Sequence, residues 1–146
     1  MTMEQDYESL KLRNQLCFPL YAASKEVVRR YTPLLEAIDL TYTQYIAIMV
    51  LWEKEEVSAK ALGDALFLDS GTLTPVLKSL EHKGYIARCR KETDERVLLC
   101  RLTDAGRALR EKALHVPHEI ASCMCLTPEE GAILYHLLYK ILGKDM

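Results

Sequence analysis

The chain has 146 residues, of which 49% are hydrophobic and 27% are charged, which suits one compact core and is short for two ordinary domains. Its longest uncharged apolar run, Tyr45 to Trp52, is too short to cross a membrane, and no basic leader precedes an apolar stretch near the N-terminus. Five cysteines, an odd number in a chain large enough to fold without crosslinks, favour reduced thiols and predict a cytoplasmic protein.

The net charge of −2 hides an uneven distribution along the chain. Residues 69–112 carry ten Lys or Arg and seven Asp or Glu, a balance of +3, whereas the remaining residues carry nine and fourteen, a balance of −5. The central third is therefore the part that would meet an anionic partner. Because solvated helix faces often carry as much charge, this excess alone is weak evidence for nucleic-acid binding.

The first predicted helix follows an apolar pattern at helical spacing that stops near Pro33. The pattern consists of Leu12, Leu16, Leu20, Ala23 and Val27. Near its start, Cys17 lies two residues before Pro19. Proline is well tolerated only in the first turn of a helix, so Pro19 predicts either a helix that begins near residues 16–18 or a kink just after Cys17. We expect the first arrangement, which places Cys17 at the positive end of the helix dipole.

The second predicted helix begins with a local hydrogen-bonding motif. Thr41 and Gln44 have the spacing of a capping box, in which each side chain satisfies a backbone N–H that the helix leaves unpaired. The apolar stretch that follows predicts a largely buried helix ending at about Lys54.

Two shorter helices are expected next, joined by a tight turn. Ser58 can cap a helix through Phe67, and either Asp69 or Ser70 can cap a second helix that ends at Gly84. So short a connection predicts a helix-turn-helix. The inward side of the second helix is formed by Leu73, Val76, Leu77 and Leu80, and the outward side by Ser70, Thr74, Lys78 and Glu81. Small hydroxyls with a lysine suit a surface that reads a DNA groove, although a solvated helix face has the same composition.

A β-hairpin is predicted after this helix. The β-prone runs YIARCR and VLLCRLT flank the polar turn segment KETDE. The basic residues around the turn are Arg88, Arg90, Lys91 and Arg96. A protruding ribbon of this kind can place arginine in a minor groove and lysine against phosphates. A helix-turn-helix followed by a basic wing is a specific combination that predicts DNA binding.

The C-terminal third is predicted to be helical. Residues 103–104 cap a helix that reaches at least His115, and Pro117 bends or interrupts it. Residues 127–130, with an N-cap threonine, a proline and two acids, start a last helix that runs to about Leu142.

These elements predict a mainly α fold with a small β-hairpin wing, a winged helix-turn-helix carried by a single chain of residues 1–146. The DNA-binding part spans about 41–103. The helices at about 7–36 and 104–146 carry more apolar residues than a small winged module needs, so we expect them to form a homodimer interface. A symmetric dimer would place two reading heads on a pseudo-palindromic site in double-stranded DNA.

Two long segments resemble the MarR family of winged-helix regulators, and within it the organic hydroperoxide resistance regulators. They are LCFPLYAASKEVVRRYTPLLEAIDLTYTQYIAIMVLWE and LFLDSGTLTPVLKSLEHKGYIARCRKETDERVLLCRLTDAGRAL, within about residues 10–115. The motifs LDSGTLTP, LCF followed by LY, and DER in the wing are specific to that branch. The resemblance implies a triangular homodimer with two winged heads, which represses a peroxidase gene until an organic hydroperoxide oxidises a cysteine. We expect no cofactor and no metal.

The resemblance also assigns roles to residues around the cysteine. Cys17 stands at the position of the peroxide-sensing cysteine, and Tyr31 and Tyr42 match tyrosines whose hydroxyls reach the sensing thiolate from the partner subunit. Tyr21 is a third matching tyrosine near the pocket. Some members carry a second cysteine late in the chain that forms an intersubunit disulfide with the sensor. Here Cys123 is preferred for that role and Cys125 remains an alternative.

In the DNA-binding part, the resemblance places five residues on the recognition helix: Asp69, Ser70, Thr72, Thr74 and Lys78. Asp94 and Arg96 match a wing-tip pair in which the acid orients the arginine into the minor groove. Such pairing explains why an acid is tolerated close to phosphate.

Other interpretations of the same residues are simpler. Cys89 and Cys100 are expected to be inert strand residues, and Tyr45 a core aromatic. A metal set made of His115, His118, Cys123 and Cys125 lacks the usual ligand spacing. Two other functions stay open beside the preferred one, which is not enzymatic: a repressor released by a non-covalent aromatic ligand in the dimer crevice, and a thiol peroxidase that uses Cys17.

Overall fold

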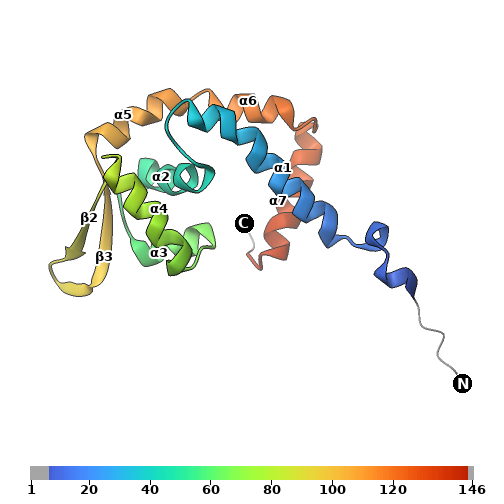
Figure 1. Cartoon of the computed structure of the whole chain (residues 1–146), viewed down its shortest axis with the longest axis horizontal. Helices are drawn as coiled ribbons and strands as arrows, with labels where there is room; N and C mark the ends of the chain where they lie inside the picture. Colours follow the sequence, from blue (N-terminus) through green and yellow to red (C-terminus); the bar gives the residue numbers. More distant parts are fainter. Residues whose placement is uncertain (1–6, 145–146) are drawn as a thin grey trace, which may run out of the picture. The chain divides into compact units, whose positions relative to one another are not determined.

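The computed structural model describes residues 7–144, and the chain divides into two compact units, residues 1–114 and residues 115–146 (Figure 1). Among the described residues, no helix combines the length and the apolar character that a membrane span requires.

The first unit opens with two short 3-10 helices, η1 (Tyr7–Leu10) and η2 (Leu12–Asn14), followed by the helix α1 (Cys17–Glu36). The helix begins at Cys17, as Pro19 predicts. The first four N–H groups of a helix have no partner within it, so a proline in this turn removes no hydrogen bond.

Two expectations about this segment are wrong. The apolar pattern does not belong to one helix, because Leu12 lies in η2. The helix also does not stop before Pro33 but includes it and continues to Glu36. Leu35, fully buried in the last turn, anchors that turn to the core, and this packing outweighs the hydrogen bond that Pro33 cannot donate.

Three capped helices form the centre of the unit: α2 (Tyr42–Lys54), α3 (Ala59–Leu66) and α4 (Ser70–His82). The capping box of α2 is present, with Thr41 as the N-cap and Gln44 reaching back to its backbone. Ser58 caps α3. Of the two candidates for α4, Asp69 is the cap, and its Oδ1 accepts the N–H of Thr72 at 2.7 Å.

The sheet has three antiparallel strands in the order β1-β3-β2: β1 (Glu56–Ser58), β2 (Ile86–Lys91) and β3 (Asp94–Leu102). The strands β2 and β3 form the predicted wing, with an irregularity in register between Arg90 and Lys91. The short strand β1 is an addition to the predicted hairpin, because three residues carry no periodicity that a sequence pattern can detect.

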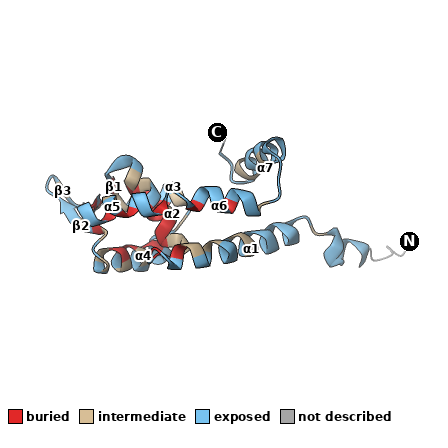
Figure 2. Cartoon of the chain, turned by 90° about the horizontal axis from the view of Figure 1, so that it is seen from above, coloured by how far each residue is buried: buried red, intermediate tan, exposed pale blue. Residues whose placement is uncertain are grey.

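The core of the unit lies between α2, α3, α4 and the sheet. Its largest fully buried side chains are Leu35, Ile48, Leu51, Leu62, Leu77, Leu80, Ile86 and Cys100. Figure 2 shows buried positions on α2, α4 and α5, whereas the strands are mostly exposed or half-buried and the N-terminal half of α1 is exposed. The helix pair that carries the reading face therefore rests on a closed core.

The helix α5 (Asp104–Ala113) completes the unit. Trp52 ties α2 to it, with Nε1 donating to the Gly106 carbonyl oxygen at 2.8 Å. A Cβ at Gly106 would lie 2.1 Å from the Tyr85 carbonyl oxygen, so this close approach requires glycine. The helix ends at Ala113, short of the predicted His115.

The second unit consists of α6 (Val116–Cys123) and α7 (Pro128–Ile141). Pro117 lies in the first turn of α6, which explains why the preceding helix stops where it does. A capping box of Thr127 and Glu130 starts α7 as predicted. No residue of α7 is buried, and its exposed large apolar side chains are Ile133, Leu134, Tyr135, Leu137 and Ile141.

Candidate DNA interface and redox site

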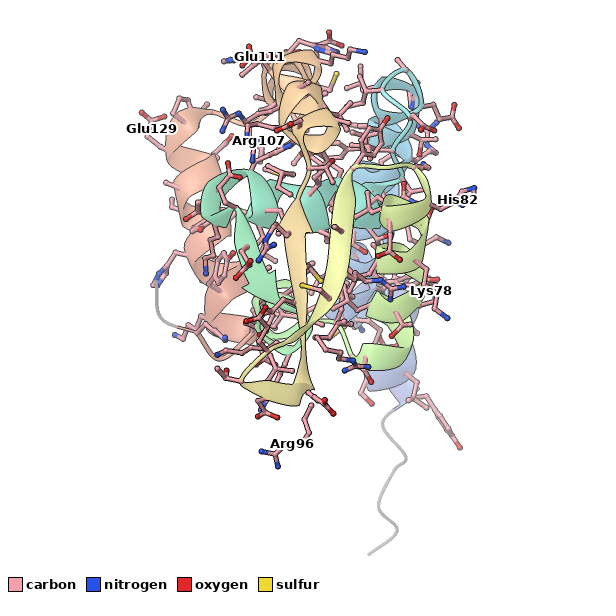
Figure 3. The ribbon with its side chains drawn as sticks, turned by 90° about the vertical axis from the view of Figure 1, so that its left-hand side faces the viewer. Lys78, His82, Arg96, Arg107, Glu111 and Glu129 are labelled. Carbon is pink, nitrogen blue, oxygen red and sulfur yellow. The ribbon has the colours of Figure 1, made fainter. Side chains whose placement is uncertain are left out.

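The outward face of α4 borders a cleft of about 560 Å³ between α3, α4 and the wing. The polar and charged residues that line it are Lys60, Asp64, Asp69, Ser70, Thr74, Lys78, Arg88 and Arg90. Figure 3 shows Lys78 on the exposed side of α4. Lys60 was not singled out from the sequence, and only its position two residues after the Ser58 cap could have suggested it.

The predicted recognition residues do not all offer free groups. Ser70, Thr72, Thr74 and Lys78 are exposed. The Thr74 hydroxyl donates to the Ser70 carbonyl oxygen at 2.7 Å, so its lone pairs are what it can offer a ligand. The backbone hydrogen bond from Thr72 lowers the pKa of Asp69, whose carboxylate acts as a helix cap.

Arg88 does not lie with the other basic residues at the wing turn. It pairs with Cys100 in the sheet register, away from the turn, and its guanidinium binds Glu81 on α4 through Nε at 3.2 Å and Nη2 at 3.0 Å. The Arg88 N–H also donates to the Glu81 carboxylate at 3.0 Å. These bonds lower the pKa of Glu81. The expectation that Arg88 clusters at the turn and that Glu81 lies freely on the outward face is therefore corrected: the two residues fasten the wing to α4.

The wing tip carries the predicted acid–arginine pair. The Arg96 Nε lies 3.0 Å from Asp94 Oδ1, and the Arg96 N–H donates to the same oxygen at 3.1 Å. The Arg96 side chain is 91% exposed and extends away from the ribbon (Figure 3). The hydrogen bonds from Arg96 lower the pKa of Asp94. Because the acid is held ionised, it fixes the direction of a guanidinium that is otherwise surrounded by solvent.

The predicted sensing cysteine has a distinct position. Cys17 is the first residue of α1, it is exposed, and the N-cap Leu16 provides no side-chain hydrogen bond to the helix. Tyr21, one turn further along, is also exposed and lies under the Lys25 ammonium, 5.1 Å from the ring centroid. The first backbone N–H groups of α1 are therefore not capped by a side chain of Leu16, and they can donate to another acceptor.

Tyr31 and Tyr42 lie together at the other end of α1. Their ring centroids are 4.9 Å apart, and Tyr45 packs on both rings at 5.8 and 6.5 Å. Tyr45 is buried, which confirms it as a core aromatic. Burial raises the pKa of Tyr31 and of Tyr42, so both hydroxyls keep their protons at neutral pH and can donate hydrogen bonds.

Cys17 and Tyr31 are separated by fourteen residues of one helix, which corresponds to roughly 21 Å of rise. The Tyr31 hydroxyl therefore cannot reach the Cys17 thiol of its own chain. A site that combines the two needs a second copy of the chain.

Comparison with known proteins agrees with this arrangement of elements. A family model described as transcriptional regulator SarA/Rot matches residues 29–113. The organic hydroperoxide resistance transcriptional regulator of Bacillus subtilis is 46% identical over 140 residues, 96% of this chain and 95% of that protein. The chain belongs to the MarR/SarA family of winged-helix transcription regulators. The mainly α fold with a β wing is confirmed, and the chain is a regulator rather than an enzyme.

A solved member of the family, AbfR of Staphylococcus epidermidis, shares this fold. Reduced AbfR bound to DNA is 35% identical, covers 93% of this chain and 95% of its own, and superposes with a TM-score of 0.78. AbfR with a disulfide formed is 36% identical, covers 93% of this chain and 92% of its own, and has a TM-score of 0.62.

The other four cysteines of the present chain differ in environment. Cys100 is buried, and burial raises the pKa of its thiol to about 11, which makes it a poor nucleophile. Cys89, on the neighbouring strand, is exposed. Cys123 ends α6 and Cys125 lies two residues beyond it with a φ of +55°, and both are exposed.

Within residues 7–144, no three His, Cys, Asp or Glu side chains come together as a metal site would require. The nearest ionic contact of His115 is with Glu119 Oε1 at 4.0 Å, one turn along α6. The histidines and cysteines of the second unit therefore do not form a ligand set in this structure.

Proposed function

We propose that the chain is a homodimeric, cytoplasmic repressor that binds a pseudo-palindromic operator and releases it when an organic hydroperoxide oxidises Cys17. The observation that carries this proposal is the exposed Cys17 at the first residue of a 20-residue helix. A helix N-terminus stabilises negative charge, and a thiolate is the reactive form of cysteine. The similarity to a hydroperoxide resistance regulator supports the choice of oxidant.

The DNA-binding surface is proposed to comprise α4 and the wing. Phosphates and base edges would meet Ser70, Thr72, Thr74, Lys78, Arg90, Lys91 and Arg96, with Asp69 and Asp94 orienting their neighbours. Arg88 would act indirectly, because its guanidinium is held by Glu81. The solved complex of reduced AbfR with DNA supports a DNA partner.

Two properties of the chain support the proposed homodimer. If the Tyr31–Tyr42 pair serves a sensing cysteine, the rise of α1 between Cys17 and Tyr31 requires that cysteine to come from a second copy. Large apolar side chains at both ends of the chain are also exposed, among them Phe18 and Leu20 on α1 and Leu137 on α7. Large apolar side chains exposed on one helix are typical of a protein interface.

The proposed chemistry consists of two balanced steps. The Cys17 thiolate attacks one oxygen of the hydroperoxide, the O–O bond breaks, an S–O bond forms, and an alkoxide leaves and is protonated to the alcohol. Sulfur loses the two electrons that the peroxide gains. The sulfenic acid then condenses with the thiol of Cys123 of the partner subunit, or of Cys125 in the alternative, so that an S–S bond forms and water leaves.

The disulfide would release DNA by linking the start of α1 to the late helices of the other subunit. A dimer binds two half-sites at a fixed spacing, so a change in the distance between the heads lowers affinity for the whole site. That AbfR has been solved both reduced on DNA and with a disulfide formed supports such a cycle.

The test uses a labelled duplex of about 30 base pairs, enough for two half-sites one helical turn apart, selected by the reduced protein from a random library. Cumene hydroperoxide is expected to release this duplex from the wild type and from Cys89→Ser, but not from Cys17→Ser. Release from Cys17→Ser would refute the mechanism. If aromatic ligands release the duplex from a variant that lacks all five cysteines, the non-covalent alternative is favoured.

Mass spectrometry of the oxidised dimer without reductant identifies the second cysteine. A Cys17–Cys123 peptide between subunits is the expected crosslink. A crosslink that survives in Cys123→Ser and disappears in Cys125→Ser would assign the role to Cys125.

A further inference from the structure

Gln44 is the one polar side chain in the buried class within residues 7–144, with 6% of its surface exposed. A buried amide is costly unless its groups are hydrogen-bonded. The burial of Gln44 therefore requires partners beyond the Thr41 N–H that it accepts in the capping box.

The amide of Gln44 binds two helices. Its Oε1 accepts the Thr41 N–H at 3.1 Å, which is the capping contact, and also the Lys83 ammonium at 3.0 Å. Its Nε2 donates to Ser79 Oγ at 2.9 Å. Ser79 lies on α4 and Lys83 is the residue that ends it. Only the contact with Thr41 serves the cap, so the other two contacts connect α2 to the recognition helix.

Lys83 extends the same network to the end of α1. Its ammonium donates to the Asp39 carbonyl oxygen at 2.7 Å and lies 3.3 Å from Asp39 Oδ1. Asp39 has a φ of +61° in the short connection between α1 and α2. The end of α1, the first turn of α2 and the end of α4 thus meet at one ammonium group.

The network adjoins the aromatic contact of the proposed redox site. Tyr42 is the first residue of α2, two residues before Gln44, and its ring lies 4.9 Å from that of Tyr31. At the other side, Ser79 directly follows Lys78, which lines the cleft beside the wing. A displacement of the first turn of α2 would therefore reach Ser79, which lies beside the DNA-binding face of α4.

We propose that Gln44, Ser79 and Lys83 form a polar bridge that transmits displacement of the Tyr31–Tyr42 pair to the recognition helix. This inference rests on the proposed function, in which the Tyr31–Tyr42 pair serves the Cys17 of a second copy, and it adds that oxidation of Cys17 displaces those tyrosines. Hydrogen bonds in a buried site have narrow geometric limits, so one relative placement of α2 and α4 satisfies all three groups. While the bridge is intact, α4 follows the first turn of α2 when that turn moves, and the recognition surface is displaced with it. Without the bridge, α4 keeps its position.

The test compares operator affinity of reduced and oxidised protein, using the selected duplex. In Ser79→Ala and Lys83→Met, the reduced protein is expected to bind like the wild type, because neither side chain lines the cleft. The ratio of oxidised to reduced dissociation constants is expected to fall by at least about fivefold, the lower end of typical coupling factors. A purely structural contact would change both constants equally and leave the ratio unchanged, which would overturn the proposal.

Trp52→Phe is the matched control, since it also removes one partly buried hydrogen bond from α2, but toward α5 instead of α4. This variant is expected to lower the midpoint temperature of unfolding and to leave the ratio of oxidised to reduced dissociation constants at its wild-type value. If Trp52→Phe lowers the ratio as much as Ser79→Ala does, the ratio follows general loosening of the unit and the bridge has no special role.

A second measurement needs no oxidant, so it separates failure of the bridge from failure of the proposed function. Tyr42→Ala, Ser79→Ala and the double variant form a cycle read by duplex affinity. The effects of the two substitutions are expected to be non-additive by about twofold or more, as for coupled sites. Additive effects would overturn the bridge even if peroxide releases the wild type. If peroxide has no effect on the wild type but the cycle is non-additive, the bridge stands and the hydroperoxide proposal fails.

Discussion

The recognition helix α4 and the C-terminal helix α7 contain similar apolar residues at similar spacing, yet they differ in burial. Leu73, Leu77 and Leu80 of α4 are buried by other elements of the same chain. In α7, Leu137 is 48% exposed and Ile141 is 65% exposed. The winged helix-turn-helix part completes its core within one chain, whereas α7 exposes large apolar side chains, as the proposed interface with another molecule would require.

The polar groups show the same contrast. In the head, Glu81 and Arg88 join a helix to a strand. On α1, Glu26 pairs with Arg29 and Arg30 within one helix, on its solvent side. Interactions in the head thus hold elements together, while those on α1 reinforce only local structure. Four substitutions or modifications test this difference, and they follow from the largest expected effect to the smallest.

Leu80→Ala is expected to lower the free energy of unfolding by about 2–5 kcal/mol, because Leu80 is fully buried and its removal leaves a cavity. The control is Leu137→Ala. Both are measured by urea denaturation at a protein concentration low enough to dissociate a dimer. Leu137→Ala should then cost much less, and equal costs would show that α7 is as enclosed as the head.

The two wing cysteines offer a chemical form of the same test. Iodoacetamide at pH 8 is expected to modify the exposed Cys89 at least about 100-fold faster than Cys100. Burial raises the pKa of the Cys100 thiol from the ordinary value of 9.0 to about 11, and this rise lowers the thiolate fraction of Cys100 by about the same factor. Peptide mass spectrometry over time gives both rates in one sample. Comparable rates in folded protein would mean that the strands β2 and β3 open readily.

Leu137→Glu tests the exposed apolar surface of α7. Charge on this surface is expected to raise the dimer dissociation constant by at least about tenfold, equivalent to 1.4 kcal/mol, since burying an unpaired carboxylate is unfavourable. His136→Glu places the same side chain on the polar side of α7, beside Lys140 in helical spacing, and should have a smaller effect. Sedimentation velocity measures both constants. If neither variant dissociates, α7 does not form the interface.

The contrast also explains which features the sequence could predict. Helix starts were predictable because caps are local: Thr41 with Gln44, Asp69, and Thr127 with Glu130 all act within three or four residues. The position of Pro19 likewise predicted a start of α1 near residues 16–18, and the helix begins at Cys17. The end of α1 was not predictable, because burial of Leu35 is a tertiary effect that overrides the local preference before Pro33.

The candidate site shows the same division. Helical spacing predicted the exposed face of α4, and the resemblance to known regulators assigned Tyr31 and Tyr42 to one thiolate; the contact between their two rings is a finding of the structure. The partner of Arg88 could not be predicted, because Glu81 belongs to another element and its approach depends on how β2 packs against α4. The double role of Gln44 was hidden for the same reason: the capping box accounts for the residue before its contacts with Ser79 and Lys83 are seen.

The smallest effect concerns the pH dependence of the Glu81–Arg88 pair. The hydrogen bonds from Arg88 hold the pKa of Glu81 below its ordinary value of 4.5. A carboxyl whose pKa is lower in the folded state contributes stability that is fully present above that ordinary value and is lost as the pH falls through the lowered pKa. Glu81→Gln should therefore be less stable than the wild type at pH 7, and the difference should shrink below pH 4.5.

Glu26→Gln is the control that relates this prediction to the contrast between the two regions. Hydrogen bonds from Arg29 and Arg30 lower the pKa of Glu26 to about 2, so the shift itself is large. The pair nevertheless lies on one helix in solvent, where screening and the mobility of the arginines reduce its contribution to folding. Urea denaturation across pH 2–7 should give a weak, salt-sensitive effect for Glu26→Gln and a salt-resistant one for Glu81→Gln, because the Arg88 side chain is mostly buried. Equal salt sensitivity would mean that Glu81 and Arg88 form an ordinary surface pair, and the wing would then be held to α4 by apolar packing alone.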